Sequence, residues 1–297
     1  MPIVKVERPA MGSLFQIFLE GDDANSLERL GYETLARVDW LEQQLSPYSP
    51  DSDISQINAL AYKESVPLAP NVTALLARSR QWHIETEGAF DITAGNLVRL
   101  WGFFKQGIVQ GDAISLPNSG VLAKIVQNIG WKCVELDETH QTLRFLSPEV
   151  ELHLGAVGKG YIVQAAADYL REQGVERALL HSGYSSVVAL GAPSNTEGWQ
   201  IALGGKPFFL NNAALSVSSN DETTITVNGK RYGHLFDPRT GSPIELFGQV
   251  AVIAPDAADA EALSTAFAVN GRQWSYNYLA AHPEFTALFS DNNESGH

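Results

Sequence analysis

The stretch from residue 229 to residue 243, GKRYGHLFDPRTGSP, predicts an extended segment set between two turns. Asn228-Gly229 at its start is a strong signal for the turn of a β-hairpin. The segment ends in Asp237-Pro238 and turns again through Thr240-Gly241, residue types that favour loops. His234 comes two residues before a phenylalanine and three before an aspartate, a position from which it could orient a substrate hydroxyl. A well-formed turn with a structurally satisfied histidine is the alternative interpretation.

Short strand patterns dominate the second half of the chain. Runs of apolar and β-branched residues with turn signals between them predict strands at residues 178–181, 186–190, 200–203, 223–227 and 249–253. A further strand is expected at residues 285–289, and Asn228-Gly229 should close a hairpin within this region. The second half of the chain, which contains residues 229–243, is therefore expected to be mainly β-sheet.

Helical spacing is more frequent in the first half. The caps Asp22, Asp23 and Asn25 predict a helix after a strand at residues 15–19. Apolar periodicity predicts further helices at residues 71–87, 119–130, 159–173 and 256–269. Residues 142–154 alternate like paired strands. Helices first and strands later predict an α+β fold with antiparallel sheets and packed helices, not a regular βαβ repeat. With no repeat and no linker in the sequence, residues 1–297 are expected to form a single domain.

Charge and hydropathy exclude several classes of protein. The formal net charge is −14, from 34 acidic and 20 basic residues, and the basic residues are scattered. Nucleic-acid binders present basic stripes to phosphate, so no nucleic-acid partner is expected. No apolar segment is long enough to span a bilayer, and Met1–Val6 lacks the pattern of an intact secretory signal. The sequence as it stands predicts a cytoplasmic protein, or a periplasmic one if a leader was removed.

Three further stretches could carry chemistry. In LHLGAVGKGY, residues 152–161, glycines around one lysine predict a bend where backbone amides could approach a phosphate, or only a turn. In DAEALSTA, residues 259–266, Glu261 and Thr265 share one helix face and could hold Mg²⁺, or could simply form a solvated face. In GAFD, residues 88–91, the aspartate could bind a ligand or cap the next residues.

The order of these stretches along the chain resembles the ApbE flavin transferase family. The matching pieces are Met11-Gly12-Ser13, LSPYSPDSDISQIN with Tyr48 and Asn58, then GAFD, LGAVGKGY, HLFDPRTGSP and EALST. The resemblance runs over about residues 10–290, and HLFDPRTGSP is its most specific piece. It implies an ApbE-like, T-fold-like architecture. It also implies an enzyme that moves FMN from FAD to a threonine hydroxyl of an acceptor flavoprotein subunit, needs Mg²⁺ and releases AMP.

The resemblance also implies roles for individual residues. His234 lies close to the chemistry, and it or a nearby carboxylate such as Asp237 would take the hydroxyl proton. The Mg²⁺ site would consist of the Ala156 carbonyl with Glu261 and Thr265. The residues expected around FAD are Met11, Tyr48, Ala89, Phe90, Asp91, His153, Lys159, Tyr184, Leu235 and Phe236.

Several positions depart from the family pattern. Glu261 stands where the family has Asp at the metal, and His153 stands where it usually has an acidic residue. Tyr184, in Gly183-Tyr184-Ser185, replaces a glycine and is expected to narrow or fill the flavin cleft. Gln164 replaces an aspartate, and Val217-Ser218-Ser219 replaces Thr-Ser-Gly. These departures leave two alternatives open, which are an FAD pyrophosphatase and a flavin-binding protein without turnover.

Overall fold

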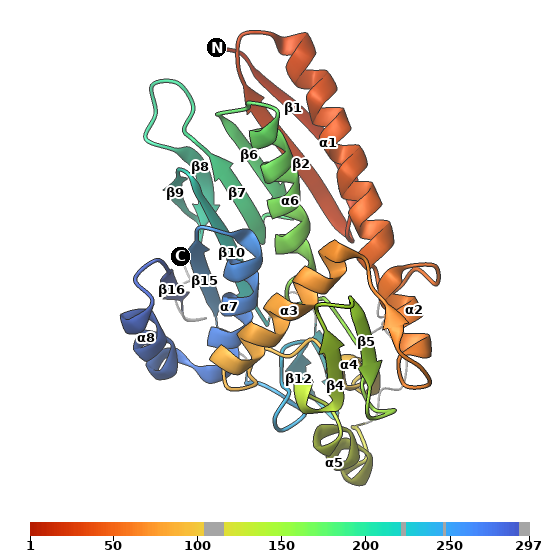
Figure 1. The fold of residues 1–297 in the computed structure, drawn as a ribbon. Helices are drawn as coiled ribbons and strands as arrows, with labels where there is room; N and C mark the ends of the chain where they lie inside the picture. Colours follow the sequence, from red (N-terminus) through yellow and green to blue (C-terminus); the bar gives the residue numbers. More distant parts are fainter. Residues whose placement is uncertain (104–115, 221–223, 246–247, 291–297) are drawn as a thin grey trace.

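One antiparallel sheet is the central element of the fold (Figure 1). The computed structural model describes residues 1–103, 116–220, 224–245 and 248–290. Within these residues, neighbouring strands of the main sheet all run antiparallel. In spatial order the strands are β1 (Ile3–Ala10), β2 (Ser13–Glu20), β6 (Ala178–Ser182), β7 (Ser186–Leu190), β10 (Ala213–Ser219), β15 (Gln249–Ala254) and β16 (Thr286–Ser290).

Three helices cover one face of this sheet (Figure 1). They are α1 (Ala24–Leu45), α6 (Gly158–Glu172) and α7 (Ala257–Asn270). Alternate residues of a strand point to one face, and Phe15, Ile17 and Leu19 of β2 are fully buried on the helix side. The largest hydrophobic cluster joins these residues to α1 and α6. Burial of this kind is the dominant favourable term in folding.

The opposite face is partly covered by a hairpin of β8 (Trp199–Leu203) and β9 (Lys206–Leu210). Trp199 is buried there, and its indole N–H donates to the Leu190 carbonyl at 3.1 Å. A smaller apolar cluster forms between this hairpin and β6, β7 and β10. Helix α8 (Arg272–Ala281) follows α7, and its aromatic residues pack with β15 and β16 in a third cluster.

A second group of elements lies beyond one end of the main sheet (Figure 1). It contains the three-stranded sheet β3-β5-β4 and the hairpin β11-β12, whose Asn228-Gly229 turn is the predicted one. The short strand pair β13-β14 is formed by part of the segment of residues 229–243. The members of the group are α2 (Asp53–Leu60), β3 (Val66–Pro67), α3 (Pro70–Glu85), α4 (Gly95–Leu100), α5 (Ser119–Gln127), η1 (Trp131–Cys133), β4 (Val134–Asp137), β5 (Thr142–Phe145), β11 (Thr224–Val227), β12 (Lys230–Gly233), β13 (Phe236–Asp237) and β14 (Ser242–Pro243).

The α+β class and the antiparallel sheets are confirmed, and some local expectations are wrong. Strand β1 was not predicted, although it pairs with β2 along its whole length. Residues 142–154 do not form paired strands beyond Phe145, because the chain then runs as a loop with one bridge from Glu151 to Ala94. Thr223 of the expected strand 223–227 lies outside the described residues. The single-domain assignment of residues 1–297 stays a prediction.

In the described part of the chain, each helix is too short or too polar to cross a bilayer.

Candidate active site

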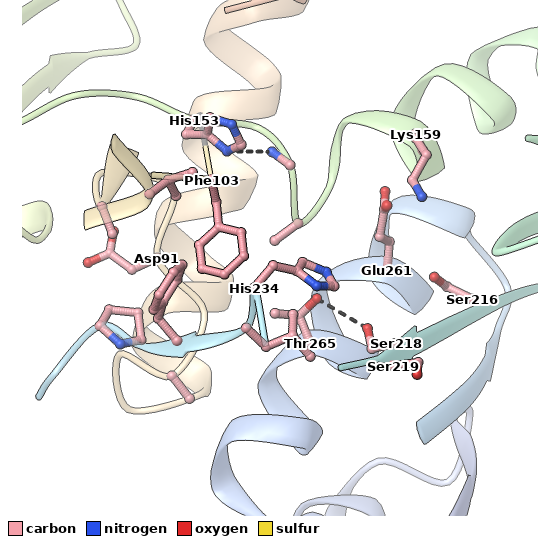
Figure 2. A pocket seen from close by; sticks show the side chains of 18 of the residues that line it. Asp91, Phe103, His153, Lys159, Ser216, Ser218, Ser219, His234, Glu261 and Thr265 are labelled. Atoms are coloured by element: carbon pink, nitrogen blue, oxygen red, sulfur yellow. Dashed lines mark hydrogen bonds between the residues drawn. The ribbon is translucent and has the colours of Figure 1, made fainter. Parts of the chain in front are cut away.

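A cavity of about 270 Å³ lies between α7, β10, the loop before α6 and the segment of residues 229–243. Figure 2 shows His234 in the middle of this cavity, with Glu261 and Lys159 on one side and Phe103 and Asp91 on the other. Most of the residues expected around FAD and Mg²⁺ line it. These residues are Tyr48, Ala89, Asp91, His153, Ala156, Lys159, His234, Leu235, Phe236, Glu261 and Thr265.

Glu261 is a buried carboxylate in the wall of this cavity. Its side chain projects from α7, the residue is 5% exposed, and Oε2 accepts the backbone N–H of Gly160 at 2.5 Å. Burial raises the pKa of Glu261, while nearby Lys159 and the Gly160 N–H oppose the rise. The expected alternative of a solvated helix face is therefore wrong. A carboxylate in this setting gains from a cation beside it.

Gly160 has to be a glycine for this contact to form. A Cβ on Gly160 would come within 2.2 Å of the Ala257 carbonyl oxygen and within 3.0 Å of Glu261 Oε2. Helices α6 and α7 approach each other here at backbone distance, which only a residue without a side chain permits. The glycine thus brings the carboxylate of one helix to the start of the other.

The amides of the glycine bend are already bonded within the protein. Gly155 N–H donates to His153 Nδ1 at 3.2 Å, and Gly158 N–H donates to the Leu154 carbonyl at 2.7 Å. The Gly160 amide serves Glu261. These three glycine amides therefore favour the turn interpretation of the bend. The residue of this bend that offers a positive charge to the cavity is Lys159, whose Nζ donates to Ser185 Oγ at 2.7 Å.

Asp91 is the buried acidic group on the other side of the cavity. Its side chain is 3% exposed, and Oδ1 accepts from Thr93 N at 2.8 Å and from Thr93 Oγ1 at 2.7 Å. His83 Nδ1 lies 3.5 Å from Oδ2. Burial raises the pKa of Asp91, and His83 and the Thr93 hydrogen bonds oppose this rise. The expected capping of Thr93 is present, and Asp91 also lines the cavity.

Residues 229–243 contribute His234 and the aromatic ring of Phe236 to the cavity wall. The backbone of Leu235 is held on both sides, since its N–H donates to Asn220 Oδ1 at 3.1 Å and its carbonyl accepts from Ile244 at 3.0 Å. Phe236 stacks edge-on against Phe103 at 5.6 Å between ring centroids. Both neighbours of Leu235 are therefore set on a fixed backbone, and His234 lines the cavity from there.

Met11, Phe90, Tyr184 and Asp237 do not line the cavity. Met11 lies in the β1–β2 turn, where its N–H donates to Glu42 Oε1 at 2.7 Å. Phe90 is fully buried core and packs edge-on against Trp82 at 5.5 Å. The expectation that these two side chains surround FAD therefore finds no support in the geometry of this cavity.

Asp237 is occupied by an ion pair. Its Oδ1 and Oδ2 accept from Arg239 Nε at 2.8 Å and Nη2 at 2.9 Å, and Oδ1 also accepts the Arg239 backbone N–H. Both oxygens of the Asp237 carboxylate are therefore occupied by one guanidinium. The turn interpretation fits Asp237 better than a catalytic one.

Tyr184 points away from the cavity. Its side chain is 70% exposed, its ring stacks on His181 at 4.2 Å, and its hydroxyl donates to Gln16 Oε1 at 3.3 Å. The residue has a φ of 62°, in the left-handed region that favours glycine. The expectation that Tyr184 narrows the cavity is wrong, because the ring stacks on His181 and does not line the cavity.

Ser216 lines the cavity and was not predicted, whereas Ser218 was named only within Val217-Ser218-Ser219 as a departure from the family pattern. Both serines lie in β10, where Ser218 Oγ lies 2.8 Å from Ser264 Oγ and 3.4 Å from Thr265 Oγ1. Polar residues on the inner face of a strand could have signalled this site. Gln164, in contrast, has a structural contact, since its Oε1 accepts the Ala257 N–H at 3.0 Å at the start of α7.

The residues present are compatible with Mg²⁺. This ion prefers oxygen ligands and is usually held by one or two carboxylates, with waters and phosphates completing the octahedron. Glu261 supplies a buried carboxylate, and Ala156 and Thr265, residues with a backbone carbonyl and a side-chain hydroxyl, line the same cavity. Among the described residues no group of three or more His, Cys, Asp or Glu side chains could hold a metal. A metal ion at this cavity would therefore need further oxygen ligands from water or from a bound phosphate.

Comparisons with known proteins give a consistent result. The model of the ApbE family matches residues 11–289. The FAD:protein FMN transferase of Chlamydia muridarum (strain MoPn / Nigg) is 31% identical over 242 residues, which cover 77% of this chain and 72% of that protein. The FAD:protein FMN transferase of Escherichia coli (strain K12) is 27% identical over 282 residues, which cover 91% and 79%.

Solved structures are similar over nearly the whole chain. The flavinyl transferase ApbE of Pseudomonas stutzeri, in its apo form, is 27% identical with a TM-score of 0.85, over 98% of this chain and 93% of that one. The ApbE protein of Thermotoga maritima is 24% identical with a TM-score of 0.86, over 98% and 95%, and shows the shared fold.

Proposed function

This chain belongs to the ApbE family, and from that premise we propose that it transfers FMN from FAD to a threonine hydroxyl of an acceptor protein, with Mg²⁺. It is an enzyme of the FAD:protein FMN transferase type, as its relatives are named. FAD is its substrate, and an acceptor flavoprotein is its partner. The metal, the threonine and the roles of individual residues are the part that we propose.

The observation that carries the proposal is the wall formed by Ala156, Glu261 and Thr265. These three residues line one cavity together with Lys159 and His234, and the Glu261 carboxylate is buried there. Cleaving a pyrophosphate requires positive charge near the phosphate oxygens and a group that handles a proton. This wall supplies residues for both.

The chain's own residues bind and orient the substrate. Lys159 offers an ammonium to phosphate oxygens, and its contact with Ser185 holds the side chain at the cavity. Asp91, Phe103 and Phe236 supply an acceptor and apolar surface on the opposite side. Much of the rate of phosphoryl transfer comes from such positioning, because the attacking and leaving oxygens must lie in line with phosphorus.

The transfer exchanges one P–O bond for another. The threonine hydroxyl oxygen attacks the phosphorus of the FMN half, and the bond from that phosphorus to the bridging oxygen breaks. AMP leaves with that oxygen, and FMN remains joined to threonine through a phosphoester. His234 is the group we assign to take the threonine proton, because Asp237 is engaged by Arg239.

Glu261, Thr265 and the Ala156 carbonyl would hold Mg²⁺, which supplies neutralisation of the charge that develops on the pyrophosphate. The raised pKa of Glu261 supports this assignment, because a carboxylate destabilised by burial gains more from a cation than an exposed one.

The proposal is tested by following flavin onto an acceptor. Purified enzyme, FAD and Mg²⁺ are incubated with an acceptor flavoprotein domain, and covalent flavin fluorescence is read on a denaturing gel. A Thr→Val variant of the acceptor is the matched control. Fluorescence on the threonine form alone supports transfer. Free FMN and AMP with an unlabelled acceptor would instead show an FAD pyrophosphatase.

A further inference from the structure

Three hydroxyl side chains form a chain of hydrogen bonds between α7 and β10, beside the buried Glu261. Ser264 Oγ donates to the Glu261 backbone carbonyl at 3.0 Å, because a carbonyl oxygen can only accept. Ser218 Oγ lies 2.8 Å from Ser264 Oγ, and it lies 3.4 Å from Thr265 Oγ1 in the contact that Figure 2 shows. The bond to the carbonyl fixes the direction of the other two.

Each hydroxyl has one hydrogen, so the direction of the whole chain can be derived. The hydrogen of Ser264 is used by the Glu261 carbonyl, so Ser218 is the donor in the 2.8 Å bond. The hydrogen of Ser218 is then used by Ser264, so Thr265 is the donor in the 3.4 Å contact with Ser218. Thr265 therefore directs its hydrogen at β10, and the lone pairs of its oxygen take no part in this chain.

The three hydroxyl residues differ in how they meet the cavity. Thr265 is half-buried and lines the cavity together with Ser218, whereas Ser264 is fully buried behind them and does not line it. A hydroxyl that binds a metal ion offers it a lone pair of the oxygen, and its hydrogen has to point elsewhere. The direction derived for Thr265 is therefore the one that a metal ligand needs.

We propose that Ser264 and Ser218 hold the Thr265 hydroxyl with its lone pairs ready for Mg²⁺, by accepting its hydrogen at β10. Both serines are positioning residues in this arrangement, since they act through Thr265. The proposal rests on the proposed function, which assigns Thr265 to the metal. Residues that bond to metal ligands commonly orient them, and their loss typically weakens metal binding about 10–100-fold.

The direction of the chain is tested without metal and without FAD. Neutron diffraction from deuterium-exchanged crystals of the metal-free protein locates the three hydroxyl deuterons. We expect the deuteron of Thr265 to point at Ser218 and the deuteron of Ser218 to point at Ser264. The deuteron of Ser264 should point at the Glu261 carbonyl. A Ser218 deuteron that points at Thr265 would overturn the proposal.

The effect on the metal is measured as the Mg²⁺ dissociation constant, by calorimetry with FAD present and no acceptor protein. Ser264→Ala removes a side chain that does not line the cavity, and it leaves the Ser218 hydrogen without its acceptor. That hydrogen then turns to Thr265 Oγ1 and occupies a lone pair, so Mg²⁺ binding should weaken about tenfold. Ser275→Ala is the matched control and should leave the constant unchanged. Ser275 is also buried and donates to a helix carbonyl, that of Gly271, in α8.

A double-mutant cycle assigns the effect to Thr265. Thr265→Val removes the hydroxyl and keeps the shape of the side chain, so adding Ser264→Ala should then change the Mg²⁺ dissociation constant by less than about threefold. Equal weakening by Ser264→Ala in both backgrounds, or no weakening in the wild-type background, would overturn the proposal. A wild-type protein that binds FAD but no Mg²⁺ would reject the metal part of the proposed function, while the neutron result would still decide the direction of the hydroxyl chain.

Discussion

Gly160 donates its backbone N–H to Glu261 Oε2 at 2.5 Å where α6 crosses α7. This contact places a carboxylate charge inside the protein and at the cavity at the same time. Burial without a cation destabilises that charge, as the raised pKa of Glu261 indicates. The buried Glu261 carboxylate is therefore expected to lower the stability of the metal-free protein, and to bind a cation at the cavity.

Glu261→Gln should make the metal-free protein more stable at neutral pH. The pKa of Glu261 in the folded protein is raised above the unfolded value of 4.5. Between these two pKa values the folded state therefore binds more protons than the unfolded state. Stability then falls as pH rises from about 4.5 upward, and the amide removes that fall. Urea unfolding at pH 7.5 and at pH 4 should show a larger advantage of the variant at the higher pH.

Mg²⁺ should act on the wild type only. Magnesium is expected to raise the melting temperature of wild-type protein in the presence of FAD, because it binds the folded state. It should leave Glu261→Gln unchanged and FMN transfer by that variant should be lost. Wild-type transfer rates in Glu261→Gln with the same Mg²⁺ dependence would contradict the metal assignment.

Gly160→Ala and Gly158→Ala form a matched pair on α6. The first Cβ would meet the Ala257 carbonyl at 2.2 Å, whereas the second would only touch Leu154 Cβ at 3.5 Å. Overpacking typically costs about 1–3 kcal/mol, so Gly160→Ala should be destabilised by at least that amount in urea unfolding. Gly158→Ala should change stability by less than about 1 kcal/mol. Equal stability of the two variants would refute the close crossing of α6 and α7.

His234→Ala should slow transfer without loss of FAD binding. A positioned proton acceptor contributes about 10²–10⁴ to the rate, so the rate of acceptor labelling should fall by that factor. FAD affinity by calorimetry should stay within about threefold. His140→Ala, in an exposed turn, is the control and should behave as wild type. A similar loss of FAD affinity in His234→Ala would assign this histidine to binding instead.

Tyr184→Gly should leave FAD affinity within about twofold of wild type, because the ring stacks on His181 outside the cavity. Relief of the left-handed backbone, worth about 1 kcal/mol, is offset by the loss of that stacking. Fluorescence titration with FAD measures the first effect and urea unfolding the second. Tighter FAD binding by the variant would mean that the ring enters the cavity when ligand is present.

Local patterns predicted the fold class, because helix caps, the Asn228-Gly229 turn and apolar spacing act over a few residues. Strand β1 was missed because Lys5, Glu7 and Arg8 give an edge strand a polar appearance, and its pairing with β2 is a tertiary fact. The loop after Phe145 was missed because alternation alone does not show whether a partner strand exists.

The resemblance, more than local chemistry, named the residues that line the cavity. Tyr48, Asp91, His153, His234 and Glu261 come from distant parts of the chain, and no spacing rule brings them together. Local contacts decided the exceptions. Arg239 engages the Asp237 carboxylate, and the Tyr184 ring stacks on His181 outside the cavity, and the motif pattern shows neither contact.

The central claim is that this cavity joins FMN to an acceptor and releases AMP. The most direct measurement is the ratio of AMP released to FMN added, from nucleotide chromatography and the intact mass of the acceptor in the same reaction with FAD and Mg²⁺. The account predicts one AMP for each added FMN, and no reaction once the metal is chelated. AMP with free FMN and an acceptor of unchanged mass, or FAD that is not consumed under any divalent metal, would contradict it.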